Sequence, residues 1–399
     1  MGYIDADTHV LECEDTWDHF DPAEREFRPI TLEHPTASGP GAESRKQYYV
    51  IGDTVTRRFH ANAQTWGYGK DYVPEVSFLK NPSVRLREMD ELGIDAQVLI
   101  STDFLNVAVD NPRAEAAICR SYNRWIAERT ADARKRLRWV IVAPTLAQER
   151  CIEELKFGKA NGAVGFMMKV DGEHGRWPED PYFWPLYEVA QDLDLTVCVH
   201  AGLARKRMEG LPFTTNYRKT VPMSPSTMMR SVLGVILANL HERFPRLRFA
   251  FLEGGSMWLP AVFTQHERNT SLLSAKGWVH TGEGTAAVVH QLDPAKELAR
   301  RNIFVACFTN EPLGFLTSFL GSDNLVHGSD MCHNDAGSDP FGHASIMART
   351  DIDRATAIKI CDTNARRAYA IPADFTPTGA TAERQAKRAP APAVQPAAA

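Results

Sequence analysis

Short apolar runs and amphipathic segments alternate along most of the chain. The apolar runs are bounded by turn residues and predict β-strands; they cover residues 3–12, 94–101, 138–144, 163–168, 195–200, 247–253, 302–308 and 324–330. The segments between them have apolar positions at helical spacing; they cover residues 81–93, 110–132, 146–160, 180–193, 224–244, 259–274 and 312–320. Strands that alternate with helices in this number predict an α/β fold, the (β/α)8 TIM barrel, with a doubly wound parallel sheet as the alternative.

Two of the predicted helices carry clear start signals. Asn81 stands before Pro82, and Asn111 stands before Pro112. The asparagine side chain can accept hydrogen bonds from the first N–H groups of a helix, and proline fits its first turn. Gly93 then provides a stop for the first of these helices.

Two regions depart from this alternation. Residues from about 20 to 80 are rich in Pro, Gly and aromatic residues and form an unusually long connection after the first strand, which predicts a lid-like insertion over one end of the barrel. Residues 374–399 contain much Ala and Pro without an apolar period and predict a disordered tail. We therefore expect one barrel domain over residues 1–373 and a tail after it.

Composition indicates an ordinary globular protein with small-molecule partners. Hydrophobic residues make up 44% of the 399 positions, and the formal net charge is -5 with scattered Lys and Arg. This charge predicts no nucleic-acid or membrane-surface partner. The start of the chain has no signal-peptide pattern and no apolar run is long enough for a membrane span, so we expect a cytoplasmic protein. The seven cysteines are widely spaced, with no Cys-x-x-Cys motif, which predicts that most of them are buried thiols.

Polar side chains stand where several predicted strands end. Asp7 and His9 lie two apart on the first strand and so share one face, His200 ends the fifth strand, Glu253 the sixth and Asp330 the eighth. In a (β/α)8 barrel the carboxyl ends of the strands meet at one mouth, which carries the active site. We therefore expect these side chains to lie together.

Two imidazoles and two carboxylates form a typical set of ligands for a divalent cation. Asp7, His9, His200 and Asp330 would hold one ion and leave a coordination position for water, whose pKa the ion can lower to about 7. Zinc is expected ahead of manganese or iron, although this ligand set accepts all three. As structural alternatives, Asp330 can be a turn residue and either histidine a hydrogen-bonded strand-end residue.

Seven segments spread over nearly the whole chain resemble a known family. They are DADTHVLE, RLREMDELGIDAQVL, YNRWIAE, DPYFWPLYEVAQDLDLTVCVHAG, RFPRLRFAFLEGGSMWLP, NLVHGSDMCHND and NARRAY. The chain resembles the amidohydrolase-related (amidohydrolase 2) family of metal-dependent TIM barrels, which includes aminocarboxymuconate semialdehyde decarboxylase. The resemblance implies a single metal ion, a homodimer, and ligands at the positions of Asp7, His9, His200 and Asp330.

The sequence departs from the decarboxylase pattern in two places. Where decarboxylases of the family have a His at the end of strand six, this chain has Glu253, which can act as a general acid or base or can anchor its loop. Where they read SDYPH, it reads SDMCH, with Cys332 in place of Pro. His333 is retained, and the resemblance implies a place close to the metal or the substrate. Cys332 has no activating partner in the sequence and is expected to be a packing residue.

Three further residues are candidates for substrate binding. Arg205 and Arg207 follow His200 and can receive a substrate carboxylate, although such a basic run is more often a solvated loop. Trp258 can wall a pocket of aromatic size or can pack in the core. Lys169 ends the fourth strand, where related two-metal enzymes carry a carboxylated lysine; because this family uses one metal, we give Lys169 no such role.

Three functions follow from these residues. The leading hypothesis is a mononuclear metal-dependent hydrolase, in which metal-activated water attacks a small carboxylated or cyclic substrate and Asp330, Glu253 and His333 serve the catalysis. The alternative is a metal-dependent non-oxidative decarboxylase, a carbon–carbon lyase acting on a hydroxyaryl or enol acid. The third is a barrel that only binds, which the intact ligand residues oppose.

Overall fold

The computed structural model describes residues 2–34, 46–58, 72–107, 109–133, 135–202, 216–276, 293–333 and 337–372. Its centre is a sheet of eight parallel strands in the order β1-β5-β6-β7-β8-β9-β10-β11. The strands are β1 (Ile4–Val10), β5 (Ala96–Ser101), β6 (Leu137–Val142), β7 (Ala163–Lys169), β8 (Thr196–His200), β9 (Arg248–Leu252), β10 (Ile303–Ala306) and β11 (Leu325–Val326). Strands that neighbour each other in sequence also neighbour each other in the sheet, apart from the inserted strands described below.

The sheet closes on itself between its first and last strands. The backbone N–H of Ala6 donates to the carbonyl of His327 (3.0 Å), that of His9 to Met331 (2.9 Å) and that of Asp330 to Asp7 (3.0 Å). These bonds run between β1 and the segment that begins with β11, so the first and last strands are joined. The barrel predicted from the sequence is confirmed, and the doubly wound sheet is excluded.

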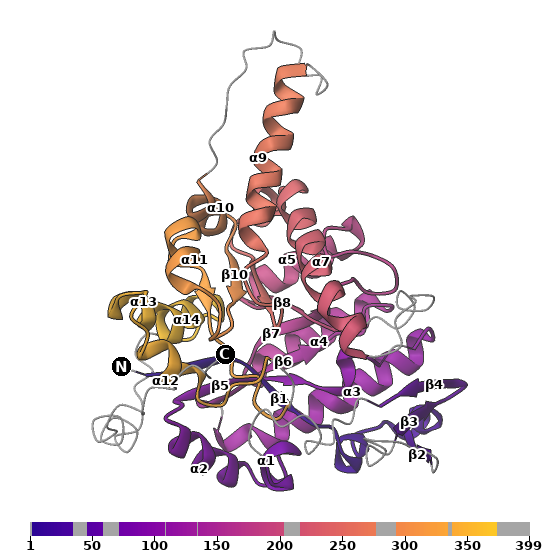
Figure 1. The fold of residues 1–399 in the computed structure, drawn as a ribbon. Coiled ribbons are helices and arrows are strands. Elements are labelled where there is room, and N and C mark those ends of the chain that lie inside the picture. Colours follow the sequence, from indigo (N-terminus) through magenta and orange to yellow (C-terminus); the bar gives the residue numbers. More distant parts are fainter. Residues whose placement is uncertain are drawn as a thin grey trace.

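Helices surround the barrel (Figure 1). Their bounds are α1 (Pro74–Ser77), α2 (Pro82–Leu92), α3 (Pro112–Arg129), α4 (Gln148–Ala160), α5 (Trp184–Asp192), α7 (Asn216–Leu237), α8 (Leu240–Arg243), α9 (Leu259–Lys276), α10 (Pro294–Arg300), α11 (Leu313–Leu320), α12 (Gly342–Met347), α13 (Arg354–Ile358) and α14 (Asn364–Ala368). Asn81 and Asn111 cap α2 and α3 as the sequence predicts, since their side chains accept backbone N–H groups of the first turn. The end of α9 projects beyond the rest of the molecule (Figure 1).

The connection after the first strand contains a small sheet. β2 (Ile30–His34), β3 (Lys46–Ile51) and β4 (Thr54–Arg57) are antiparallel to one another, in the order β2-β3-β4. The sequence predicts an insertion here but no strands within it. Residues 35–45 and 59–71 of the insertion, and the tail predicted at 374–399, lie outside the described residues.

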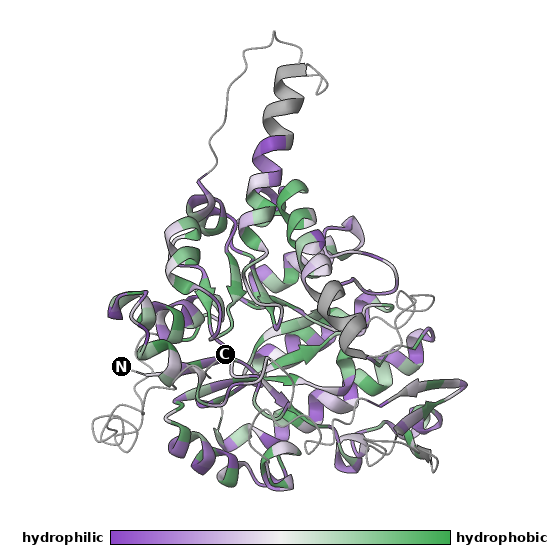
Figure 2. Cartoon of the chain, in the orientation of Figure 1, coloured by the Kyte–Doolittle hydropathy of each residue, from purple (hydrophilic) through white to green (hydrophobic). Residues whose placement is uncertain are grey.

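Apolar side chains fill the barrel and the layer between barrel and helices. Figure 2 shows the hydrophobic residues along the strands and on the inner sides of the helices, with hydrophilic residues outside. All seven cysteines are free and six of them are buried, as the sequence predicts. Among the described residues, no helix combines the length and apolar character that crossing a membrane requires.

Candidate metal centre

The strand β1 brings two of the predicted ligands to the barrel mouth. Asp7 and His9 are 2% and 0% exposed, and Asp7 Oδ1 lies 3.6 Å from His9 Nε2. Alternation along a strand puts side chains two apart on one face. The pattern DADTH therefore presents both groups to the same space.

The other two predicted ligands reach the same point from distant parts of the chain. His200, at the end of β8, places Nε2 3.4 Å from Asp7 Oδ1. Asp330, just after β11, places Oδ1 3.2 Å from His9 Nε2. All four side chains are buried. The structure thus brings together the four residues that the sequence selects.

The chemistry of this set fits a divalent cation. Asp7, His9 and His200 each offer a ligand atom within 4.8 Å of those of the other two. Within the described part of the chain, Asp7 Oδ1, His9 Nε2 and His200 Nε2 have no hydrogen-bond partner. Buried polar atoms are nearly always hydrogen-bonded, because leaving one unpaired costs about 1–3 kcal/mol. A divalent ion held by imidazole nitrogens and carboxylate oxygens accounts for all three atoms.

The protonation state of His9 suits a ligand. Burial lowers its pKa well below the usual value, and the neighbouring His333, His200 and Arg85 lower it further. The lowered pKa favours the neutral form of the His9 imidazole. A neutral imidazole nitrogen is the form that coordinates metals.

Two further groups complete the cluster. Glu253 follows β9 and places Oε2 3.4 Å from His200 Nδ1. His333 places Nδ1 2.8 Å from Asp330 Oδ1. Glu253 and His333 also lie within 4.8 Å of ligand atoms of His9 and Asp330. Glu253 and His333 therefore lie beside the four predicted ligands, one of which, Asp330, is the third residue predicted to be catalytic.

Two residues of the cluster have an unusual backbone conformation. Glu253 has φ +55° and Asp330 has φ +52°, in the left-handed region that residues with a Cβ rarely adopt. Such strain persists only where the surrounding structure enforces it, and it gathers at functional sites.

Two residues that support the cluster were not found from the sequence. Thr102 Oγ1 lies 3.0 Å from His333 Nε2. Glu311 accepts hydrogen bonds from the backbone N–H groups of Ser256, Met257 and Phe308 and so holds the loop that follows Glu253. Neither residue belongs to a recognisable motif, because each acts through a contact between distant segments.

Asp5, also on β1, supports the site through a contact with Ser329. Its carboxylate accepts the backbone N–H of Ser329 (2.8 Å) and its hydroxyl (2.6 Å), which ties β1 to the residue before Asp330. Burial raises the pKa of Asp5 to about 7. Asp5 therefore helps to hold Asp330 in place relative to β1.

Comparison with known families agrees with this geometry. The family model described as Amidohydrolase matches residues 78–371, which is most of the chain. The chain belongs to the amidohydrolase family. It is thereby placed among the metal-dependent enzymes of the amidohydrolase superfamily, and the resemblance read from the sequence is confirmed.

Solved structures similar to this amidohydrolase share its fold. An amidohydrolase from Mycobacterium avium subsp. paratuberculosis K-10 is 18% identical with a TM-score of 0.67, over 91% of this chain and 98% of that one. 5-carboxyvanillate decarboxylase from Sphingomonas paucimobilis is 16% identical with a TM-score of 0.61, over 93% and 99%. Dihydroxybenzoic acid decarboxylase from Polaromonas sp. JS666, with bound manganese and 2-nitroresorcinol, is 18% identical with a TM-score of 0.60, over 94% and 98%. At these identities the likeness shows the fold.

The predicted substrate-binding residues of the amidohydrolase stay predictions. Arg205 and Arg207 lie outside the described residues. Trp258 is 6% exposed, and its indole N–H donates to the carbonyls of Gly254 (3.1 Å) and Gly255 (2.8 Å). Its polar atom therefore serves the loop after Glu253 in this structure.

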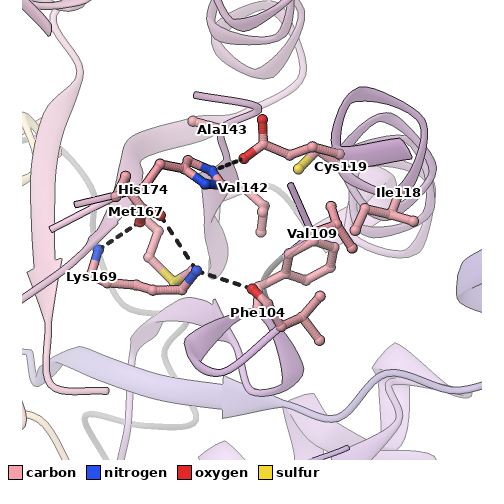
Figure 3. Close-up of a pocket in the computed structure, with 12 residues that line it drawn as sticks. Phe104, Val109, Ile118, Cys119, Val142, Ala143, Met167, Lys169 and His174 are labelled. Carbon is pink, nitrogen blue, oxygen red and sulfur yellow. Dashed lines mark hydrogen bonds and ion pairs between the residues drawn. The ribbon is translucent and has the colours of Figure 1, made fainter. Parts of the chain in front are cut away.

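Cys332 and Lys169 have environments that fit the roles expected from the sequence. Burial raises the pKa of Cys332 to about 11, so the thiol is not a nucleophile at neutral pH. Lys169 donates to the carbonyl of Val107 (3.0 Å) and lies 3.4 Å from Glu173 Oε2 (Figure 3). It lines a small cavity with His174, whose ring is paired with Glu115, and none of the predicted ligands lines that cavity.

Proposed function

We propose that this amidohydrolase holds one divalent cation with Asp7, His9, His200 and Asp330 and acts on a small carboxylated substrate. The proposal rests on one observation: these four side chains, from β1, β8 and the segment after β11, are buried and lie next to one another. When bound, the cation supplies positive charge that holds and polarises the oxygens of a substrate. Zinc and manganese both suit this ligand set, and manganese is present in the similar Polaromonas structure.

The reaction we propose is a non-oxidative decarboxylation. Two of the similar structures described above are named as decarboxylases, of 5-carboxyvanillate and of dihydroxybenzoic acid. In such a reaction the bond from a substrate carbon to its carboxyl carbon breaks, and the electron pair stays on the substrate carbon. Carbon dioxide leaves and a proton takes its place. The chain must therefore provide an acid beside the reacting carbon, and Asp330 is the residue we assign to that role.

His333 and Thr102 are placed to control the proton on Asp330. His333 Nδ1 lies 2.8 Å from Asp330 Oδ1. The other ring nitrogen, Nε2, lies 3.0 Å from Thr102 Oγ1, and this contact holds the ring beside Asp330. A histidine so placed can take up or return the proton that Asp330 exchanges with the substrate carbon.

Hydrolysis is the second candidate, and Glu253 favours it. A carboxylate stands at the end of β9, 3.4 Å from His200, where the decarboxylase pattern has a His. A carboxylate so placed can accept a proton from an attacking water. The same four ligands would serve this reaction.

One experiment separates the two reactions. The protein is purified, loaded with Mn²⁺ or Zn²⁺, and incubated with a panel of hydroxybenzoic acids and with a panel of lactones and cyclic amides in isotopically labelled water. Release of CO2, with solvent deuterium at the vacated carbon, supports decarboxylation. Incorporation of water oxygen into the product supports hydrolysis. If neither panel reacts although metal is bound, the proposed reactions are wrong for these substrate classes.

Matched histidine variants test the site. We expect His9→Ala to lose the stoichiometric metal and to lower kcat/KM by at least about 100-fold. His241→Ala serves as the control because His241, on α8, contacts Arg300 and Arg301 and none of the predicted ligands. Equal activity of the two variants would contradict the assignment of His9.

A further inference from the structure

The predicted ligands stand on the two sides of the barrel seam, the junction of β1 with the segment 325–333. Asp7 and His9 belong to β1, and Asp330 follows β11. β11 is only two residues long, and Thr8 and Met331 make an isolated bridge beyond it. Few ladder bonds therefore hold the seam. Its spacing sets the distance between Asp330 and the two ligands of β1.

Arg85, on α2, crosses this seam from the outside of the barrel. Its side chain is fully buried. On the β1 side, Nη1 donates to the carbonyl of His9 (2.9 Å) and Nη2 to the hydroxyl of Thr8 (3.3 Å). On the other side, Nη1 lies 3.8 Å from Cys332 Sγ.

Gln97 extends the same connection. Arg85 Nε donates to Gln97 Oε1 at 2.8 Å, and Gln97 Nε2 lies 2.9 Å from Met331 Sδ. Gln97 is itself fully buried, at the start of β5. The guanidinium thus reaches both residues that follow Asp330, one directly and one through an amide.

The energetics indicate a purpose other than stability. Within the described residues, the hydrogen-bond acceptors of Arg85 are all uncharged: two carbonyls, a hydroxyl, an amide and a thiol. Removing a cation from water costs several kcal/mol, and neutral acceptors offset less of that cost than a carboxylate does. The other buried arginine among the described residues, Arg301, has a carboxylate partner in Glu297.

We propose that Arg85 is a positioning residue for the metal centre: its planar fork holds the seam and fixes the distance between the β1 ligands and Asp330. The inference rests on the proposed metal site. A guanidinium presents several donors in one rigid plane, so a single side chain can hold both sides of the seam in register. A lysine at this position would keep the charge but not the plane.

The test compares metal affinity in matched arginine variants. Arg85→Met and Arg301→Met each remove a buried guanidinium, but Arg301 contacts Ile236, Asn239, His241 and Glu297 and no predicted ligand. Mn²⁺ affinity is measured by chelator competition, and the visible spectrum of the Co²⁺-loaded protein reports the ligand geometry. We expect Arg85→Met to weaken Mn²⁺ binding by about 10- to 100-fold and to alter the Co²⁺ spectrum. Arg301→Met is expected to lower thermal stability alone.

A second pair keeps the test decisive if a methionine variant does not fold. Arg85→Lys is expected to bind Mn²⁺ more weakly than the wild type, whereas Arg301→Lys binds it with unchanged affinity. Arg85 variants that fold and keep both the wild-type affinity and the wild-type spectrum would overturn the positioning role while leaving the metal site intact. A wild-type protein that binds no Mn²⁺, Zn²⁺ or Co²⁺ would overturn the proposed function and, with it, this inference.

Discussion

A buried carboxyl group near the barrel mouth makes the stability of the protein depend on pH. Glu12 lies two residues past the end of β1 and accepts the backbone N–H of Asp103 (2.9 Å) and the hydroxyl of Ser101. Burial raises its pKa to about 8, and the nearby charge of Asp103 acts in the same direction. Glu12 is therefore largely protonated in the folded protein at neutral pH. In the unfolded chain its pKa is about 4.5.

We expect Glu12→Gln to remove this pH dependence. Between about pH 4.5 and pH 8 the folded wild type retains a proton that the unfolded chain loses. Its free energy of unfolding thus falls as pH rises, by up to about 1.4 kcal/mol per pH unit. Above pH 8 both states are ionised and the loss is complete. Glutamine does not titrate, so the free energy of unfolding of the variant should rise relative to that of the wild type between pH 5 and pH 8. Denaturation curves measure this difference, with a chelator present to remove metal ions. Parallel curves would show that Glu12 is ionised in the folded state.

At the level of single residues, the sequence indicates the proposed ligands more clearly than the residues that support them. Asp7, His9, His200 and Asp330 stand at strand ends, and the fold fixes where such ends meet. Thr102 and Glu311 lack this signal, since their contacts join segments far apart in the chain.

The position of Arg85 in the sequence indicates its burial, although the other charged residues of α2 make this hard to recognise. On α2 the buried side chains are Arg85, Met89 and Leu92, so the arginine takes a place in the apolar stripe of the helix. A charged residue at such a position is a sign of a buried polar contact. Because α2 contains several other charged residues, the sequence alone does not distinguish Arg85 from an arginine exposed to solvent.

A glycine lets the segment after β11 approach β1. A Cβ added at Gly328 would lie 2.3 Å from Cβ of Asp7 and 3.0 Å from its Cα. The backbone atoms of Asp7 cannot move easily to make room for this Cβ. Glycine is therefore required at this point of the seam, beside a predicted ligand.

We expect Gly328→Ala to displace Asp7 relative to Asp330. Overpacking of this kind costs about 1–3 kcal/mol of stability, and Mn²⁺ affinity should fall by about 10-fold or more, since the ligands separate. Gly175→Ala is the control: it has φ +81° and so is strained by alanine, but nothing lies within 4 Å of the added Cβ. The readouts are thermal midpoint and chelator competition. Unchanged Mn²⁺ affinity in folded Gly328→Ala would mean that the seam tolerates movement.

Whole elements were predicted best where pattern and caps agree. The predicted helix at 81–93 is α2 (Pro82–Leu92), but the one at 224–244 is divided: α7 ends at Leu237, and Asn239 with φ +49° precedes α8. The inserted strands β2 to β4 were missed because Pro and Gly around them read as loop. Apolar periodicity does not record such local turns.

Barrel closure is a property of the whole molecule that element order alone does not determine. Alternating strands and helices fit an open sheet as well as a barrel, and the difference is whether the first strand meets the last. Here it does, through backbone bonds from Ala6, His9 and Asp330. The expected homodimer and cytoplasmic location concern the molecule in its surroundings and stay predictions.

Because the proposed ligands come from both ends of the barrel sequence, metal binding should stabilise the whole fold. A ligand that binds only the folded state raises the free energy of unfolding by RT ln(1 + [M]/Kd), which is about 2.7 kcal/mol at 100 times Kd. For a chain of this length that corresponds to a rise in Tm of about 3 °C. Tm should therefore rise with the logarithm of Mn²⁺ concentration above Kd and fall again on chelation.

Two aspartate variants show whether this stabilisation arises at the proposed centre. Asp330→Asn removes a ligand charge and should abolish the Mn²⁺-dependent rise in Tm. Asp323→Asn changes an exposed aspartate that pairs with Lys359 and should keep the rise. Because both substitutions lie in the same segment after β10 and remove the same charge, a general effect of charge would move both variants alike. If Mn²⁺ raises the Tm of Asp330→Asn as much as that of the wild type, the stabilising ion binds elsewhere. Metal binding at the seam would then not be the cause of the stabilisation.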